Sequence, residues 1–398
     1  MQIRPTTEQD REVFATTVHA AFGRFPETPD PDGGGLWWSA TEMDRNLLAL
    51  TGDGRPVGTA GACSFELTLP GGAVVPAAGV TSVGVLPTHR RRGLLTAMMR
   101  HQLADLRARG ELLAVLLSSE SLIYGRFGYG PATYTQRLTV PRHRAAFRGT
   151  PAAPGSIELL QRDEKLLAEV YDRYRRAQPG ALSRPKRWWS LGAGQPPVSR
   201  APRYLAVHRD ADGVADGYAS YSGAESGTIT VDEIVTTDDA VHSALARFVL
   251  GHDLVNQVVF KHVPPEHPLR WQLADFNAAE QTNHTDWLWV RLLDLPRALT
   301  SRAWSADGEL VLDVTDPFLD EQHRLLLAAR DGAATCTPTG RAPDLSLDVR
   351  DLGSVYLGGT RPSTLVRAGF VQAHQPGAVA LADALFHTER PPHCLHWF

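Results

Sequence analysis

The stretch from Val80 to Arg100 constrains the fold most, because it joins an apolar strand to an amphipathic helix through a basic turn that ends in a glycine. It reads VTSVGVLPTHRRRGLLTAMMR. Gly93, where strand gives way to helix, lets another backbone or a phosphate come close, and the first amides of a helix have no intrahelical partner. Arg90, Arg91 and Arg92 add positive charge at the same place. The stretch therefore predicts an α/β unit with a pyrophosphate site.

The motif in this stretch is neither a P-loop, G-x-x-x-x-G-K-[ST], nor a Rossmann turn, G-x-G-x-x-G. The pattern V-x-V-x-P-x-x-R-R-R-G-x-x resembles the acyl-CoA loop of the GNAT acetyltransferase superfamily. That loop usually reads [Q/R]-x-x-G-x-[G/A], and this chain has Leu95 in place of the last small residue. For the segment taken alone, a basic helix N-terminus on a solvated surface is the alternative interpretation.

The composition describes a globular protein of two or three domains, with 398 residues, 43% hydrophobic and 21% charged. A net charge of −4 gives no general reason to bind nucleic acid or an anionic membrane. The three cysteines are far apart and form no C-x-x-C, which argues against a disulfide framework or a zinc knuckle. The N-terminus lacks the apolar core of a signal peptide, and no apolar run approaches the ~20 residues of a membrane span. The expected compartment is the cytoplasm.

The first 147 residues have the element order of the front of a GNAT fold. A strand at Ile3 precedes a Thr7–Asp10 capping box. The helix that follows carries Val13, Phe14, Val18, Ala21 and Phe22 on one face. Three strands (Leu47–Leu50, Val57–Leu69 and Ala73–Leu86), a helix from Gly93 to Gly110 and a buried strand at Leu112–Leu117 complete the order.

Residues 148–286 repeat this order of strands and helices, which indicates an internal duplication. Strands are expected at Ile157–Leu160, Tyr204–Val207, Asp216–Ser222, Thr228–Thr236 and Val258–Lys261, and helices at Asp163–Arg176 and Asp238–Leu250. The arginine-glycine turn is replaced here by Thr236-Thr237-Asp238-Asp239, whose acidic side chains would repel a pyrophosphate. The second unit is therefore predicted to be a degenerate copy that does not bind CoA.

Residues 287–398 are predicted to form a third, α+β unit. Its strands are expected at Leu288–Leu293, Glu309–Val314 and Leu345–Val349, and its helices at Pro296–Arg302, Asp351–Leu357, Ser363–Ala368 and Val379–Phe386.

A second motif, SSESLIYGRFGYGPAT from Ser118 to Thr133, follows the buried strand. Ser118 or Ser119 is expected to cap a short helix, which places Tyr124 one turn inside it. A phenol with a pKa of about 10 and a thiol with one of about 8.5 are matched closely enough for general acid catalysis. The alternatives are that Tyr124 only packs, or that Tyr129 or Tyr134 takes the role.

The two motifs together resemble the Eis (enhanced intracellular survival) family of N-acetyltransferases. The third unit adds C-T-P-T at Cys336–Thr339 and L-G-S-V-Y-L-G at Leu352–Gly358, so the resemblance covers the whole chain. It implies two tandem GNAT-like mixed β-sheet units, the second degenerate, and a C-terminal sterol-carrier-protein-like α+β domain. It also implies acetyl-CoA as co-substrate, no metal, acetylation of primary amines, and a homo-hexamer built as a trimer of dimers.

The resemblance also implies the site residues. The catalytic pair would be Tyr124 and the α-carboxylate of the last residue, Phe398. Cofactor contacts would come from Val83, Gly84, Val85, Arg91, Arg92, Gly93, Leu94, Leu95, Thr96, Ser119 and Glu120. An aromatic chain end is unusual because termini are normally polar and frayed, and partial burial would raise the pKa of the carboxylate and make it a better base. A terminus anchored only by packing is the alternative.

The acceptor is the least constrained part of the prediction. Trp37 and Trp38 follow an acidic loop and would line an amine pocket or belong to the core, and Trp397 would add bulk to the pocket. The acceptor could be an aminoglycoside-like polyamine, a smaller amine or a lysine side chain. Transfer of a longer acyl chain, and a non-catalytic sensor of acyl-CoA or lipid, are the alternative functions. The cluster of His387, His393, Cys394 and His396 matches no standard zinc spacing.

Overall fold

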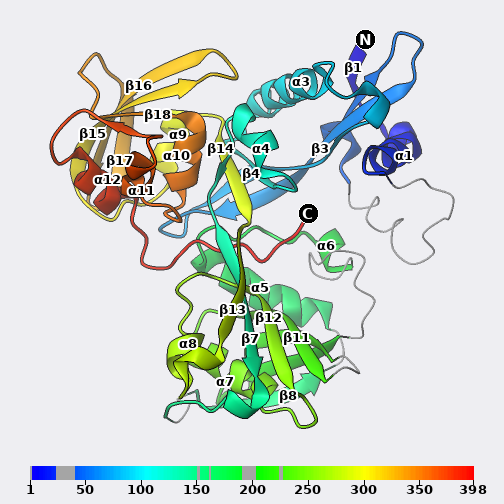
Figure 1. Ribbon diagram of the computed structural model, residues 1–398, viewed down its shortest axis with the longest axis vertical. Helices are drawn as coiled ribbons and strands as arrows, with labels where there is room; N and C mark the ends of the chain where they lie inside the picture. The colour runs from blue at the N-terminus through cyan, green and yellow to red at the C-terminus, as the bar shows by residue number, and fades with distance from the viewer. Residues whose placement is uncertain (1, 24–40, 150–152, 161–162, 191–202, 224–226) are drawn as a thin grey trace.

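Three β-sheets form the framework of the protein in the computed structural model (Figure 1). The structure describes residues 2–23, 41–149, 153–160, 163–190, 203–223 and 227–398. In the view of Figure 1 the first sheet lies at the upper right, the third at the upper left and the second below them. Among the described residues, no helix is both long and apolar enough to cross a membrane.

The first sheet has the strand order β1-β2-β3-β4-β5-β14-β6. Its strands are β1 (Gln2–Pro5), β2 (Leu47–Leu50), β3 (Pro56–Thr68), β4 (Val74–Val85), β5 (Leu113–Leu117), β14 (Leu288–Leu292) and β6 (Gly130–Pro131). Side chains alternate between the faces of a strand. Leu48 packs with Phe14 of helix α1 (Arg11–Ala21), whereas Leu47 and Ala49 pack with Leu94 of helix α3 (Leu94–Ala108). The two helices therefore cover opposite faces of the sheet.

The second sheet has the order β13-β7-β12-β11-β10-β9-β8. Its strands are β13 (Glu280–Asp286), β7 (Tyr134–Pro141), β12 (Gln257–Val263), β11 (Thr228–Thr236), β10 (Ala215–Gly223), β9 (Tyr204–Arg209) and β8 (Ser156–Leu160), with helices α5 (Glu164–Ala177) and α7 (Asp239–Leu250) packed on them. Strands β11 and β12 are parallel and joined through α7, just as β4 and β5 are parallel and joined through α3. This correspondence confirms the predicted duplication of the fold.

Two strands pair in the sheet of a unit other than the one to which the sequence assigned them, with unit boundaries at 147 and 286. Strand β7, within the first predicted unit, pairs with β12 and β13 in the second sheet. Strand β14 was expected in the third unit, and that expectation is wrong, because β14 pairs with β5 and β6 in the first sheet. An apolar strand pattern indicates that a segment is buried but not which strand it pairs with. The unit boundaries at 147 and 286 stay a prediction.

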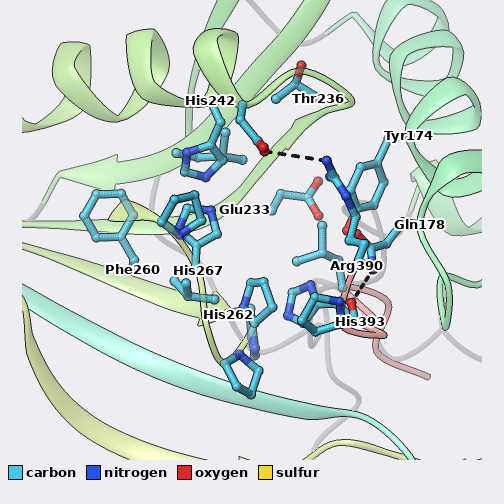
Figure 2. A pocket seen from close by; sticks show the side chains of 18 of the residues that line it. Tyr174, Gln178, Glu233, Thr236, His242, Phe260, His262, His267, Arg390 and His393 are labelled. Carbon is cyan, nitrogen blue, oxygen red and sulfur yellow. Dashed lines mark hydrogen bonds and ion pairs between the residues drawn. The ribbon is translucent and has the colours of Figure 1, made fainter. Parts of the chain in front are cut away.

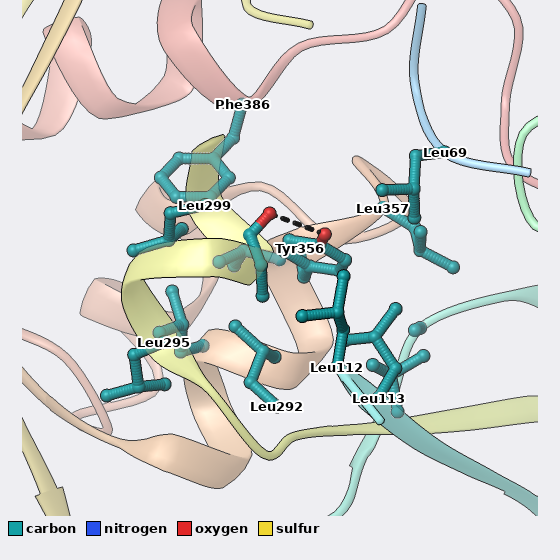
Figure 3. Close-up of a cluster of buried hydrophobic side chains, with 14 of the residues drawn as sticks. Leu69, Leu112, Leu113, Leu292, Leu295, Leu299, Tyr356, Leu357 and Phe386 are labelled. Carbon is teal, nitrogen blue, oxygen red and sulfur yellow. Dashed lines mark hydrogen bonds between the residues drawn. The ribbon is translucent and has the colours of Figure 1, made fainter. Parts of the chain in front are cut away.

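The third sheet has the order β17-β16-β15-β18-β19, and its helices hold it against the first sheet. The strands are β15 (Gly308–Asp316), β16 (Glu321–Arg330), β17 (Ala333–Pro338), β18 (Leu345–Asp348) and β19 (Gln372–Ala373), and the helices are α9 (Leu295–Ser301), α10 (Val349–Tyr356), α11 (Pro362–Arg367) and α12 (Ala378–Phe386). Figure 3 shows leucines of the first sheet in one cluster with side chains of α9, α10 and α12. In its centre the Tyr356 hydroxyl donates a hydrogen bond to the carbonyl oxygen of Ala298, 2.7 Å away.

A buried ion pair also joins the first sheet to the third. Arg291 of β14 is fully buried and donates to the Asp316 carboxylate at the end of β15 and to the Phe127 carbonyl oxygen. Arg291→Met leaves this buried carboxylate without its cation, so we expect it to lower the free energy of unfolding by about 3 kcal/mol. Arg107→Met removes the half-exposed pair with Glu321 and should cost about 1 kcal/mol or less. Urea unfolding of both variants measures the difference, and equal losses would contradict it.

Candidate active site

The parallel strands β4 and β5 separate at the middle of the first sheet. They pair only from Ala77 opposite Leu113 to Gly79 opposite Val115, although β4 continues to Val85 and β5 to Leu117. Beyond Gly79 the two strands therefore form an open split.

A bulge in β4 opens this split. Thr59 of β3 pairs with Gly84 and Gly61 pairs with Thr81, so Ser82 and Val83 stand opposite a single residue of β3. Ser82 has a φ of 53° and its carbonyl oxygen accepts a hydrogen bond from Thr59 Oγ1 at 2.8 Å. A bulge bends its strand and increases the local twist, which turns the end of β4 away from β5. A positive φ at a serine has no sequence signal, and sequence reasoning missed it.

Helix α3 follows the turn after β4, and no side chain of the described residues caps the amide groups of its first turn. Its N-cap is Gly93, with a φ of 77°. In helix α7, by contrast, the Asp238 carboxylate accepts hydrogen bonds from the amides of Ala240 and Val241 at 2.6 and 3.3 Å. An anion can thus meet free amides at the start of α3, whereas a carboxylate already occupies the matching position in the second unit.

A cavity of about 670 Å³ connects the start of α3 with the strand split and with the second motif. Ten of the eleven residues expected to contact the cofactor line it: Val83, Gly84, Val85, Arg91, Gly93, Leu94, Leu95, Thr96, Ser119 and Glu120. Arg92 is exposed and is not among the lining residues. Leu95, like Val83 and Ile123, packs against the buried core and lines the cavity, so the departure from the usual loop pattern forms part of an apolar wall.

Arg90 has a different role from its neighbours. Its guanidinium donates hydrogen bonds to the carbonyl oxygens of Val85 and Ala21, at 3.2 and 2.9 Å. It therefore ties the turn to the end of β4 and to α1.

Several lining residues were not among the cofactor contacts expected from the sequence: Ala21, Phe22, Gly23, Pro87, His89, Arg90, Ile123 and Arg126. Phe22 was expected on the buried face of α1 but is 56% exposed at the cavity, and Val13, expected on the same face, is 43% exposed. Ile123 and Arg126 flank Tyr124 in the second motif, and that adjacency is the only signal that could have found them.

Tyr124 is the last residue of helix α4 (Ser121–Tyr124) and lines the cavity with 9% of its surface exposed. Burial raises the pKa of its hydroxyl to about 12, and the nearby Glu120 carboxylate adds to the rise. Glu120 is also the N-cap residue of α4, so the expectation that Ser118 or Ser119 caps the helix is wrong. At neutral pH the Tyr124 phenol is a protonated donor facing the cavity.

The two competing tyrosines lie outside the cavity wall. Tyr129 is fully buried, with its ring 6.2 Å from that of Tyr124. The Tyr134 hydroxyl is 2.8 Å from Thr360 Oγ1, and its ring stacks on His284. Of the three tyrosines, only Tyr124 can present its hydroxyl to a molecule in this cavity.

The chain end is buried beside the strand split. The last residues run from the third unit to the middle of the molecule (Figure 1), and Phe398 is 5% exposed. Its ring lies 5.1 Å from that of Phe65 on β3 and 6.1 Å from that of His396. A Cβ on Gly79 would lie 3.0 Å from the Phe398 ring and closer still to Phe65, so the glycine at the fork of β4 and β5 makes room for the chain end.

Of the three tryptophans expected at the acceptor pocket, the structure describes only one. Trp37 and Trp38 lie outside the described residues. Trp397 is partly buried between two buried neighbours, His396 and Phe398.

Family models match along most of the chain. An acetyltransferase (GNAT) domain matches residues 2–132, a second one matches 180–292, and a sterol carrier protein domain matches 295–395. An uncharacterized N-acetyltransferase of Streptomyces avermitilis is 35% identical over 414 residues, which cover 100% of this chain and 99% of the relative. N-acetyltransferase Eis of Mycobacterium tuberculosis is 33% identical over 392 residues, 93% of this chain and 94% of Eis.

The crystal structure of Eis1 from Mycobacterium abscessus superposes with a TM-score of 0.89 at 34% identity, over 100% of both chains. Fold and relatives together define an acetyltransferase with two GNAT domains and a sterol carrier protein domain, a class that uses acetyl-CoA as donor. Within this class, the chain belongs to the Eis family of N-acetyltransferases.

Two adjacent arginines of the turn offer a matched test of the cavity. Arg91 lines it and Arg92 does not, although both are exposed. We expect Arg91→Ala to weaken CoA binding about tenfold, equivalent to roughly 1.4 kcal/mol, because it removes a cation beside the start of α3. Arg92→Ala should change the Kd by about twofold or less. Calorimetric titration with CoA measures both, and an equal loss for the two variants would refute the distinction.

Proposed function

We propose that the protein transfers the acetyl group of acetyl-CoA directly to a primary amine, with Tyr124 as general acid and the Phe398 carboxylate as general base. One observation carries this proposal: a single cavity joins the uncapped start of α3, the split between β4 and β5, and the Tyr124 side chain. Such a cavity suits a long donor with an anionic end and a reactive end. Val83, Gly84 and Val85 would bind the pantetheine amides, and Arg91 to Thr96 would hold the pyrophosphate, with Arg92 at its periphery.

The proposed reaction forms a bond between the acceptor nitrogen and the acetyl carbon and breaks the bond between that carbon and sulfur. The ammonium form of the acceptor gives one proton to the Phe398 carboxylate, and the free amine attacks the thioester carbon. The C–S bond then breaks, and the departing sulfur takes the proton of the Tyr124 hydroxyl. The nitrogen releases its second proton to solvent, which gives the neutral amide. Before the next turnover Tyr124 regains a proton from solvent and the Phe398 carboxyl group releases the one it took.

The raised pKa of Tyr124 is compatible with this role. Against a free thiol of pKa about 8.5, a donor with a pKa of about 12 would be a weak acid. Burial in this protein raises thiol pKa values as well, and the pKa of the buried Cys63 rises to about 12. Desolvation of a thiolate in the cavity would shift its pKa in the same direction, which brings it closer to that of Tyr124 and favours proton transfer between them.

The acceptor is proposed as a primary amine: an aminoglycoside-like polyamine, a small amine or a lysine side chain. The resemblance to the Eis family supports this class, and the chain end supplies a carboxylate that attracts an ammonium group. The family resemblance likewise supports a homo-hexamer built as a trimer of dimers.

A thiol-release assay with acetyl-CoA and a panel of amines tests the proposal. We expect CoA release that depends on the amine, with the acetylated amine identified by mass spectrometry. Tight CoA binding without release on any amine would overturn the proposed activity. Release from longer acyl-CoA donors alone would replace acetyl transfer by transfer of a longer chain.

A further inference from the structure

The second unit contains a cavity at the position that corresponds to the strand split of the first. Strands β11 and β12 pair in parallel only from Thr228 opposite Gln257 to Val231 opposite Phe260, and β11 then continues to Thr236. A cavity of about 390 Å³ lies beyond this fork (Figure 2). Residues of α5, α7, the segment 264–268 and the chain segment 389–395 complete its wall. The degenerate unit has thus kept the split of the fold, although its anion-binding turn is lost.

Most of the charged groups around this cavity have partners within the described chain, and the other two, Glu266 and Glu389, are exposed at its wall. Glu233 accepts two hydrogen bonds from Arg184, at 3.0 and 2.7 Å, and one from the Tyr218 hydroxyl at 2.8 Å. Lys261 lies 2.5 Å from the Asp232 carboxylate. Figure 2 shows Arg390 reaching toward Asp239, 3.6 Å away. An anionic ligand would find no unpaired cation among these groups, because Lys261 and Arg390 both lie beside carboxylates.

Among the described residues, imidazole nitrogens are the buried side-chain atoms of this wall that lack hydrogen-bond partners. His242, His262, His267 and His393 all line the cavity (Figure 2). Within the described chain, the Nδ1 atoms of His242 and His262 and the Nε2 atom of His393 are buried without a hydrogen-bond partner. His393 is 2% exposed. Each buried polar atom left unpaired costs about 1–3 kcal/mol, so a ligand that satisfied these atoms would recover that free energy.

The four imidazoles are uncharged at neutral pH. Burial lowers the pKa of His242 and His262 to about 4 and that of His393 to about 3, and it also lowers that of His267. A neutral imidazole has one donor and one acceptor nitrogen. In the described part of the chain, no group of three His, Cys, Asp or Glu side chains has the arrangement to hold a metal ion. The rings therefore offer hydrogen bonds to an organic molecule.

Part of the wall is apolar. Phe260, Val231 and Leu395 are buried hydrophobic residues that line the cavity, and proline side chains complete it. We propose that this cavity binds a small uncharged aromatic or heteroaromatic molecule with an amide or hydroxyl group. Its ring would pack on the apolar wall, and its polar group would hydrogen-bond to the imidazoles. A cavity of this size suits a ligand of this kind.

Benzamide and benzoate are matched probes for the proposal, because they have nearly the same shape and differ in charge. We expect benzamide to bind with a Kd in the millimolar range, as for a ligand of about nine heavy atoms, and benzoate to bind about tenfold more weakly or not at all. Ligand-observed NMR with the full-length protein measures both. Equal binding of the two probes, or no binding of benzamide, would overturn the proposal.

Two leucine variants on opposite walls locate the site. His242→Leu and His393→Leu each remove an unpartnered nitrogen at similar side-chain volume, so we expect benzamide affinity to fall about tenfold without a fall in melting temperature. If one variant fails to fold, the other still tests the site. Tyr124→Phe alters the other cavity and should bind benzamide like the wild type. The binding test of this cavity is therefore independent of whether the proposed catalytic activity is found. Unchanged benzamide binding in a folded leucine variant would refute the site.

Discussion

Conversion of the Phe398 carboxylate to a carboxamide should lower kcat by about 10²- to 10⁴-fold, the range of general acid–base catalysis, and leave the Kd for CoA unchanged. The amide keeps the size of the terminal group but cannot accept the proton of the incoming ammonium. The Phe398 ring would still pack against Phe65 and fit the space left by Gly79. Semisynthesis of the C-terminal segment gives this variant, and single-turnover kinetics with the best amine measure the effect.

A Gly-Gly extension after Phe398 is the second form of this experiment. It keeps a terminal carboxylate but moves it away from the ring, so kcat should fall to a similar extent. A Gly-Gly extension at Met1 is the matched control and should have wild-type kinetics. A carboxamide or a C-terminally extended protein with full activity would exclude the carboxylate as base and leave the chain end with a packing role only.

Tyr124→Phe should lower kcat by about 10²- to 10³-fold, again with CoA binding retained. The substitution removes one oxygen atom at a residue that is 9% exposed and lines the cavity, so the shape of the wall is kept while the proton donor is lost. Tyr129→Phe is the matched control. Its hydroxyl is buried without a partner among the described residues, and its removal should leave kcat within about twofold of wild type and not lower stability.

The pH dependence of this variant provides a separate test. Because the pKa of Tyr124 is raised to about 12, its hydroxyl stays almost fully protonated at neutral and mildly alkaline pH, and the acid is present throughout a normal assay range. The ratio of wild-type to Tyr124→Phe kcat should therefore be the same at about pH 7 and about pH 9. A ratio that shrinks steadily across this interval would mean that Tyr124 loses its proton there and that its environment differs from the one described.

Local features of the fold were predictable because their causes lie within a few residues. The Thr7–Asp10 capping box is present as expected. The helix after Gly93 begins at Leu94 and is followed by Gly110, which has a φ of 77°. Caps, left-handed glycines and apolar periodicity are properties of short segments, so the sequence pattern carries them directly.

Pairing between distant strands was not predictable from those patterns. Leu288–Leu292 has the same apolar run wherever it pairs, and only the assembled sheet puts β14 between β5 and β6. The exposed position of Phe22 at the cavity has the same origin. Phe22 follows the last residue of α1 as its C-cap, and a Cβ on Gly84 of β4 would lie 3.7 Å from its ring, a neighbourhood that only the folded chain creates.

By itself, the sequence determined the order of elements, the basic turn before α3 and the acidic one before α7, because residue identity sets local geometry and local charge. Tertiary structure decided how those pieces meet: the Ser82 bulge that opens the strand split, the choice of Tyr124 over Tyr129 and Tyr134, and the burial of Phe398 beside Gly79. These outcomes depend on contacts between residues that are distant in the sequence, such as Thr59 with Ser82 and Gly79 with Phe398. Packing and shape fix such contacts, and no short stretch of the chain encodes them.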